Sequence, residues 1–144
     1  DLLFPHPVSY MEIARLDIRN PGVFSFDSEY TAGRENPDAY KGKLVILVNS
    51  ETQSAAETAV MMFQKVPGSM TVGSQSAGAD GSAVSLALPG GLETIFTGEG
   101  GYYPGREAVQ RKGVRIDCVV CPTKERVLEG RDEPLEKAIE LIGK

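Results

Sequence analysis

Ser54 and Glu57 are the residues of this chain whose types and spacing are best suited to chemistry. They stand three positions apart, directly after an apolar run at 44–48 and a polar turn at 49–53. The run is rich in Val, Ile and Leu and predicts a short buried strand, and a helical pattern begins at Ser54. A strand, a turn and a helix in this order would present the Ser54 side chain at the mouth of a sheet.

Two interpretations of Ser54 follow from these residues. In the first, Ser54 and Glu57 form a capping box, in which each side chain hydrogen-bonds to the backbone of the other residue. In the second, Ser54 is a nucleophile, because a helix start offers free N–H groups and about half a positive charge that could hold an oxyanion. The same local geometry serves both roles, so this stretch is compatible with either.

The composition limits the classes of protein to consider. The chain has 144 residues, of which 41% are hydrophobic and 24% charged, as expected for one globular domain. Its net charge is -5 with both signs mixed, so the absence of a basic stripe argues against nucleic acid as the main partner. No apolar run approaches the roughly 18 residues that a membrane span needs. The chain begins at Asp1, which suggests a processed or excised piece.

Cys118 and Cys121 form a CVVC motif inside a Val-rich run. One such pair with a single His in the chain does not supply the four ligands of a structural zinc site. A redox pair usually opens a helix, whereas this run predicts a strand, on which residues three apart face opposite ways. The sequence therefore predicts two ordinary strand cysteines, with no metal and no cofactor.

Strand and helix patterns alternate along the rest of the chain and predict the α/β class. Strands are expected at 8–16, 23–26, 44–48, 70–72 and 114–120, a hairpin at 82–88 and 92–97, and helices at 54–66 and 134–142. Polar connections are expected at 27–43 and 122–133, a small-residue loop at 74–81, and a turn-rich loop at 98–105.

Five motifs in order resemble the C-terminal processing peptidase family, which contains the tail-specific and tricorn-like serine peptidases. They read VNSETQSAAE, VGSQSAGADG, LPGG, GYYPGREAVQRKGVRID and DEPLEKAIELI, and they extend from about Tyr40 to the end of the chain. The resemblance implies a crotonase-like/ClpP-like fold, in which repeated β-β-α units stack as an α/β sandwich. It also implies that residues 1–144 are a single domain or a C-terminal fragment of a longer serine peptidase catalytic domain.

The activity that the resemblance implies is serine endopeptidase cleavage of peptide or protein substrates. The family nucleophile falls on Ser54, and the Ala55 N–H would be one oxyanion donor. An extended substrate would lie as an added strand beside the one that precedes the loop at 74–81, with Gly73, Ser74 and Gly78 as contacts. The family also implies export to the periplasm or cell envelope, and it leaves the oligomeric state open.

Two positions depart from the family pattern. The tail-specific branch has a Lys base 25 residues after its nucleophile, where this chain has Ala79. The tricorn-like branch has an upstream His and a downstream Glu, and the Glu position falls near Gln110. The only His, His6, lies in a Pro-flanked segment that matches no family motif, and Asp80 is expected to form a turn with the Gly that follows it.

These departures leave two hypotheses open. In the first, the chain is part of a serine peptidase whose base, together with the family's second oxyanion donor, lies outside these residues. In the second, it is a catalytically inactive relative that binds peptides or serves as a structural domain, and Ser54 is only a helix cap. An acyl-CoA enzyme on the related fold finds no support, because the basic residues do not cluster as a phosphate clamp.

Overall fold

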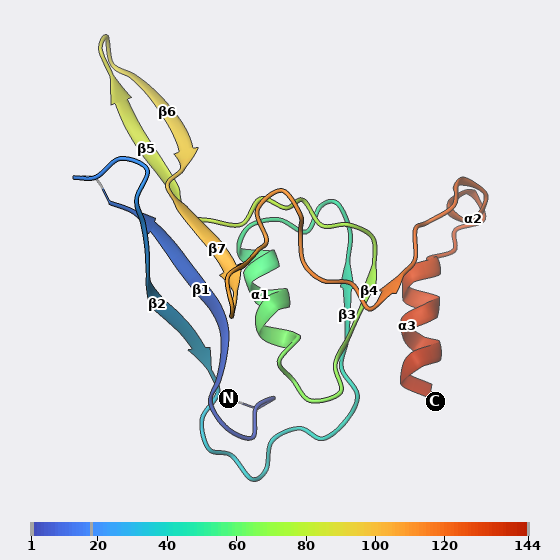
Figure 1. Ribbon diagram of the computed structural model, residues 1–144. Coiled ribbons are helices and arrows are strands. Elements are labelled where there is room, and N and C mark those ends of the chain that lie inside the picture. Colours follow the sequence, from blue (N-terminus) through green and yellow to red (C-terminus); the bar gives the residue numbers. More distant parts are fainter. Residues whose placement is uncertain (1, 18, 144) are drawn as a thin grey trace.

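The computed structural model describes residues 2–17 and 19–143 and has the α/β organisation that the sequence predicts. The helices are α1 (Ala55–Phe63), α2 (Lys124–Leu128) and α3 (Glu133–Gly143). The strands are β1 (Val8–Leu16), β2 (Phe24–Ala32), β3 (Val45–Val48), β4 (Met70–Gly73), β5 (Ala83–Leu88), β6 (Leu92–Thr97), β7 (Glu99–Tyr103), β8 (Glu107–Ala108) and β9 (Cys118–Val119). Helix α1 lies between an antiparallel and a parallel sheet (Figure 1), and α3 packs on the parallel sheet.

The antiparallel sheet has the order β2-β1-β7-β8. Strand β1 has the predicted bounds, and two register shifts along its pairing with β2 explain its imperfect alternation. Strand β2 runs well past the predicted end at 26, because the polar residues beyond it pair with β1 as far as Ala32. The predicted loop at 98–105 is also wrong. Residues 99–102 of β7 pair with β1, and Gly101 lies where a Cβ would be 2.6 Å from the Met11 side chain.

The parallel sheet has the order β3-β4-β9, and α1 connects its first two strands as a βαβ crossover. Strands β3 and β4 confirm the predicted positions to within a residue. The predicted strand at 114–120 is reduced to β9, since only Cys118 and Val119 pair with β4. Just before it, the Asp117 carboxylate accepts the Thr71 N–H at 2.7 Å. Both Cys118 and Cys121 are free thiols, and Cys121 lies beyond the strand.

The core fills the space between the two sheets. Met61 of α1 and Val109 belong to it and are completely buried, as is Val72 of β4. The other members of the core come from β1, β3, α1, β7 and the segment after β8: Met11, Ile13, Ile46, Val48, Val60, Tyr103 and Val114. At the edge of the core, the Tyr103 hydroxyl donates to the Gln64 side chain at 2.7 Å and accepts the Arg115 N–H at 3.0 Å. The core packing and the Tyr103 hydrogen bonds together hold α1 in place between the two sheets.

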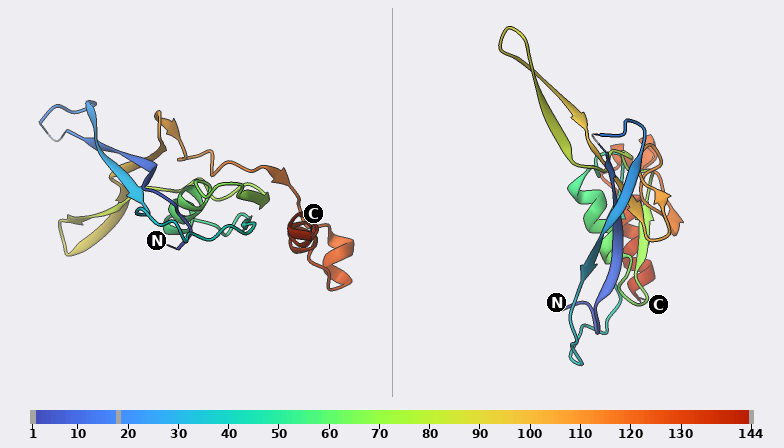
Figure 2. Two further views of the ribbon diagram at one scale, coloured as in Figure 1. Left: turned by 90° about the horizontal axis from the view of Figure 1, so that it is seen from below. Right: turned by 60° about the vertical axis from the view of Figure 1, so that its left-hand side comes forward.

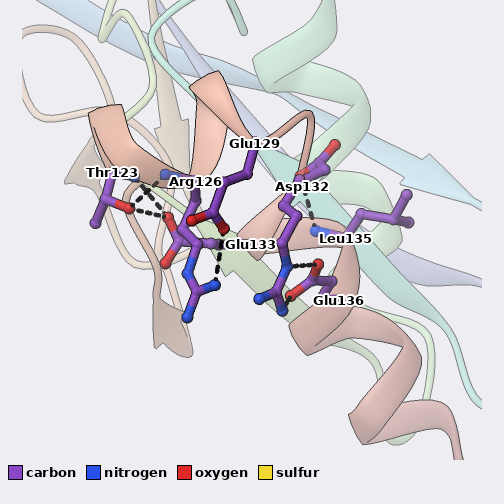
Figure 3. A network of polar contacts seen from close by, with 8 residues as sticks. Thr123, Arg126, Glu129, Asp132, Glu133, Leu135 and Glu136 are labelled. Atoms are coloured by element: carbon purple, nitrogen blue, oxygen red, sulfur yellow. Dashed lines mark hydrogen bonds and ion pairs between the residues drawn. The ribbon is translucent and has the colours of Figure 1, made fainter.

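Helices α2 and α3 form a separate layer on the far side of the parallel sheet (Figures 1 and 2). Helix α3 confirms the predicted C-terminal helix, whereas α2 lies inside the predicted connection at 122–133. Figure 3 shows the junction, where Thr123 donates to Glu133 through its N–H at 2.6 Å and its hydroxyl at 2.8 Å. Arg131 binds Glu136 through two hydrogen bonds of 2.7 and 2.5 Å. No helix within the described residues has the length and apolar character that crossing a membrane requires.

The predicted hairpin is confirmed, and it projects from the body of the molecule (Figures 1 and 2). Strands β5 and β6 pair only with each other, and every residue of both strands is exposed. Paired residues share a face of a hairpin, so Val84 and Phe96, then Leu86 and Thr94, then Leu88 and Leu92 form one mainly apolar face. The apolar face of the hairpin is therefore exposed to solvent.

Candidate active site

Ser54 has an unusual backbone conformation at the start of α1. Its φ of 52° and ψ of -120° place a residue with a side chain in a region that normally requires glycine. An ordinary helix cap has an extended backbone, as Thr123 does before α2 with φ of -91° and ψ of 148°. The strained strand-to-helix turn is instead the arrangement that exposes a nucleophilic serine at the top of a sheet. The Ser54 side chain is exposed.

The Glu57 carboxylate holds this turn in place through hydrogen bonds. Its side chain is completely buried, and each carboxylate oxygen accepts two hydrogen bonds. Oε1 accepts from the Ser76 hydroxyl at 2.6 Å and the Gly78 N–H at 2.8 Å. Oε2 accepts from the Ala79 N–H at 2.9 Å and the Ser54 N–H at 3.2 Å. The bond from the Ser54 N–H belongs to the predicted capping box, which the structure confirms. The other three bonds tie the loop after β4 to the turn that carries Ser54.

The Ala55 N–H is available beside Ser54. The next amide, that of Ala56, donates to the Gln53 carbonyl at 3.0 Å, whereas Ala55 N–H has no partner among the described residues. Amides of a first helical turn point away from the helix and carry the positive end of its dipole. An oxyanion formed next to Ser54 could therefore accept a hydrogen bond from Ala55.

A cleft of about 280 Å³ opens next to Ser54. Met11 and Ile13 of β1 supply apolar side chains to its lining, and Tyr30 of β2 supplies an aromatic ring with a hydroxyl. Ser54, Thr58 and Asp80 line it as well. Thr58 lies one helical turn after Ser54, and its N–H donates to the Ser54 carbonyl at 3.0 Å. The cleft thus combines an exposed hydroxyl, apolar side chains and one carboxyl group.

Asp80 is the carboxyl group of this cleft, and it is buried, with only 3% of its surface exposed. Its Oδ1 accepts the Thr58 hydroxyl at 3.0 Å, and its Oδ2 has no hydrogen-bond partner within the described residues. Burial raises the pKa of Asp80, and the negative charge of Glu57 raises it further, while the Thr58 hydrogen bond opposes both effects. The sequence predicted only a loop turn at Asp80, and the structure shows in addition that its carboxyl group is buried.

The positions discussed as possible bases do not supply one. Ala79, at the lysine position, donates its N–H to Glu57. The side-chain oxygen of Gln110 is buried without a partner in the described part of the chain. His6 is exposed and does not line the cleft. No His, Lys or Arg from the described residues lines the cleft next to Ser54.

The predicted substrate contacts lie apart from this cleft. Gly73 is buried at the end of β4, where a Cβ would be 1.8 Å from the Val48 carbonyl oxygen, and the Gly78 N–H is held by Glu57. Ser74 lines a larger cleft of about 440 Å³, together with Asn49 and residues of the α2–α3 layer. A strand added beside β4 is not available, because β3 and β9 occupy both of its edges. A direct role of Gly73, Ser74 and Gly78 in binding substrate stays a prediction.

Sequence reasoning missed three features of the site. The SAAE spacing indicated that Glu57 contacts Ser54, but its bonds to Ser76, Gly78 and Ala79 depend on the chain returning through β4. Thr58 gave no sequence signal. Asp80 gave a weak one, since it adjoins the position where the family has its lysine.

Three solved structures resemble the chain in fold. A structure from Parabacteroides merdae, described as that of a candidate peptidase, superposes with a TM-score of 0.86 at 19% identity, covering 97% of this chain and 44% of that one. Mature CPAF complexed with lactacystin gives 0.67 at 20% identity, with 78% and 22% covered. The photosystem II D1 C-terminal processing protease gives 0.62 at 20% identity, with 99% and 33% covered. The chain thus spans less than half the length of each.

The sequence itself decides the family. No curated protein matches the chain significantly. Residues 9–120, which include all of β1 after Val8 as well as Ser54, Glu57 and Asp80, match peptidase family S41. This match covers most of the chain and agrees with the resemblance that the five motifs carry. The chain belongs to peptidase family S41.

Proposed function

We propose that this chain is the nucleophile-bearing part of a serine endopeptidase of the C-terminal processing type. The observation that carries the proposal is Ser54, which is exposed, held in a strained backbone conformation at a helix start and adjacent to the unpartnered Ala55 N–H. A cap residue has no need of such a conformation. Family membership and the likeness of the fold to processing proteases support the same function.

The chemistry assigned to Ser54 is acyl transfer. Its Oγ forms a bond to the carbonyl carbon of a peptide, and its proton passes to a base. The carbonyl oxygen becomes an oxyanion that accepts the Ala55 N–H, an interaction typically worth ~10²–10³ in rate. The C–N bond then breaks, the leaving amine takes the proton from the base, and water hydrolyses the acyl-enzyme ester.

The base is proposed to come from outside these 144 residues. The absence of a basic side chain among the described residues that line the cleft supports this. The chain also spans only 44% of the Parabacteroides structure, so there is room in such a protein for a further catalytic segment. We propose that residues 1–144 form a C-terminal portion of a crotonase-like/ClpP-like catalytic domain.

The test is labelling of the full native protein that carries this chain with a fluorophosphonate, a reagent that bonds to activated serines with loss of fluoride. Mass spectrometry should locate the adduct on Ser54, and a Ser54→Ala variant should remain unlabelled. The peptide-binding relative without catalysis makes the opposite prediction. A folded full-length protein that gives no Ser54 adduct would overturn the peptidase function.

A further inference from the structure

Strand β5 starts in the cleft next to Ser54 and has an open edge. Gly81, Ser82 and Ala83 line this cleft of about 280 Å³, and β5 begins at Ala83. From there the strand leaves the body of the molecule together with β6 (Figures 1 and 2). Within the described residues β5 pairs only with β6, so its other edge has no strand partner there.

The pairing of the hairpin shows which residues face the open edge. The Gly98 N–H donates to the Ser82 carbonyl at 2.9 Å, and the pairing continues from there without a register shift. In an antiparallel pair, residues that bond to the partner strand alternate with residues whose N–H and C=O point away from it. Because Ser82 bonds toward β6, the backbone groups of Ala83, Ser85 and Ala87 point to the open edge.

The composition of β5 does not protect this edge. Edge strands are usually kept from pairing by charged side chains, by proline or by a covering segment. The sequence of β5, AVSLAL, contains neither a charge nor a proline. Val84, Leu86 and Leu88 are exposed on the apolar face of the hairpin. A strand added to the open edge would place every second side chain beside these three residues.

The other strands at the cleft are less suited to receive an extended peptide. Met11 and Ile13 belong to β1, whose two edges are taken by β2 and β7. Strand β2 has an open edge, but among its described residues only Tyr30 lines the cleft, and the charged Glu29 precedes it. In contrast, the consecutive residues 81–83 lead from the cleft directly into β5.

We propose that the open edge of β5 binds the substrate as an added strand that continues from the Ser54 cleft along the hairpin. The inference rests on the proposed function of Ser54. Residues beside the attacked bond would lie in the cleft, and the adjoining segment would bond to Ala83, Ser85 and Ala87. The substrate class is an extended, unfolded segment in which every second residue is apolar, because those residues lie beside the apolar face.

A substrate fits this edge better than a permanent strand from elsewhere in the native protein or from a second copy. Any strand on the edge of β5 leads toward the cleft, because β5 itself begins there. A permanent strand would obstruct the approach to Ser54, whereas a substrate has to enter it. Strand β5 extends over about 17 Å from Ala83 to Leu88, so a peptide of about nine residues overlaps it fully.

The first part of the experiment detects strand addition without relying on cleavage. The full native protein carrying Ser54→Ala is titrated into a labelled peptide of that length in which valine alternates with serine. Two further peptides carry N-methyl groups, one on its central valine amides and the other on its central serine amides. In an added strand, alternate amides bond to the neighbouring strand and the others point to solvent. We expect one methylated peptide to bind about tenfold more weakly than the parent peptide and the other to bind equally well.

Two proline variants show whether β5 is the strand that receives the peptide. Ser85 and Ile95 are paired across the hairpin, and the N–H of each points away from the other strand. Ser85→Pro therefore removes a donor from the open edge of β5, and Ile95→Pro removes the matching donor from β6, without breaking a bond of the hairpin. We expect Ser85→Pro to weaken binding of the parent peptide about tenfold and Ile95→Pro to leave it unchanged.

Equal effects of the two methylated peptides would overturn the inference, and so would failure of the parent peptide to bind. Unchanged affinity in Ser85→Pro, or equal losses in both proline variants, would also overturn it. Amide hydrogen exchange of the Ser54→Ala protein, resolved by residue, needs no change in the hairpin and decides the question even if a proline variant does not fold. The peptide should slow exchange at Ala83, Ser85 and Ala87, and unchanged exchange there would refute binding to β5.

Fluorophosphonate labelling of the wild-type protein is measured in parallel, because this small reagent does not need the edge of β5. A Ser54 adduct without protection of the β5 amides refutes only the role of β5. Protection of these amides without an adduct refutes only the peptidase and leaves β5 as the edge that binds peptides.

Discussion

The Ser54 turn and the β5–β6 hairpin are determined in opposite ways. In the hairpin, each strand pairs only with its neighbour in sequence, and a short turn with Gly90 and Gly91 in left-handed conformations joins them. In the Ser54 turn, an unfavourable backbone is held by Glu57, whose partners Ser76 and Gly78 lie about twenty residues further along the chain. The hairpin is set by local sequence, and the turn is set by packing.

The two regions also differ in the kind of side chain that they expose and bury. The hairpin exposes apolar side chains such as Leu92 and Ile95, which are 65% and 68% exposed. The Ser54 region does the reverse and buries two acids, Glu57 and Asp80. Buried polar groups stabilise a unique arrangement only when their hydrogen bonds are complete. The comparison therefore predicts large effects where buried bonds are broken and small effects on the hairpin.

Glu57→Gln should have the largest effect. A glutamine has one acceptor oxygen, and an NH₂ group replaces the second carboxylate oxygen. That NH₂ group would face N–H or O–H donors that now bond to Glu57. At least one of these donors is a backbone N–H. Leaving such buried donors unpaired should lower the free energy of unfolding by about 2–4 kcal/mol. Urea denaturation measures the loss, and fluorophosphonate labelling of the folded fraction should fall with it.

Glu51→Gln is the matched control for this change. Glu51 lies on the turn before α1, is exposed and has no described side-chain hydrogen bond. Its replacement should alter the free energy of unfolding by no more than about 0.5 kcal/mol. Equal stability of the two variants would show that Glu57 does not hold the turn.

The strain at Ser54 predicts a difference between two replacements. With φ at 52°, Ser54→Gly should relieve the backbone, whereas Ser54→Ala should retain the strain. We expect the glycine variant to be the more stable of the two by about 1 kcal/mol, in contrast with the usual cost of glycine near a helix. Thermal denaturation of both proteins measures it, and an alanine variant more stable than the glycine variant would refute the strained conformation.

Asp80→Asn should have a smaller effect that depends on pH. Burial raises the folded-state pKa of Asp80 above its unfolded value, so the protonated acid favours the folded state. That contribution is complete below the unfolded pKa and is lost as the pH rises through the folded one. Asparagine does not ionise, so the stability of the variant relative to the wild type should increase from pH 4 to pH 7. Denaturation curves at both pH values test this, and a decrease would contradict it.

What could be predicted from the sequence follows the same division. The β3–turn–α1 unit and the hairpin have local signals, namely an apolar run, a helical period and a Pro-Gly-Gly turn, and the structure confirms both. Strand β7 was missed because its glycines resemble a loop, yet Gly101 is needed where β7 passes close to Met11 and Asp80. The second half of β2 is polar and is a strand only because β1 lies beside it.

The candidate site divides in the same way. Ser54 and Ala55 could be named as candidates because a helix start is a local feature with a known chemistry, and their catalytic roles stay a prediction. Three of the four bonds of Glu57 and the burial of Asp80 could not be predicted, since they arise when the loop after β4 folds back over α1. Single-sequence patterns do not encode which distant backbone amide meets a given carboxylate.

Leu86→Ser on the hairpin should have the smallest effect on stability. Leu86 is 49% exposed in the middle of the apolar face, so the change removes little buried surface and should alter the free energy of unfolding by no more than about 0.5 kcal/mol. Met61→Ala, at a completely buried position of α1, should cost about 2–5 kcal/mol and provides the scale. Urea denaturation of the full native protein compares them. A loss for Leu86→Ser that approaches that of Met61→Ala would show that another part of the protein covers this face, since only burial could make a surface leucine so important.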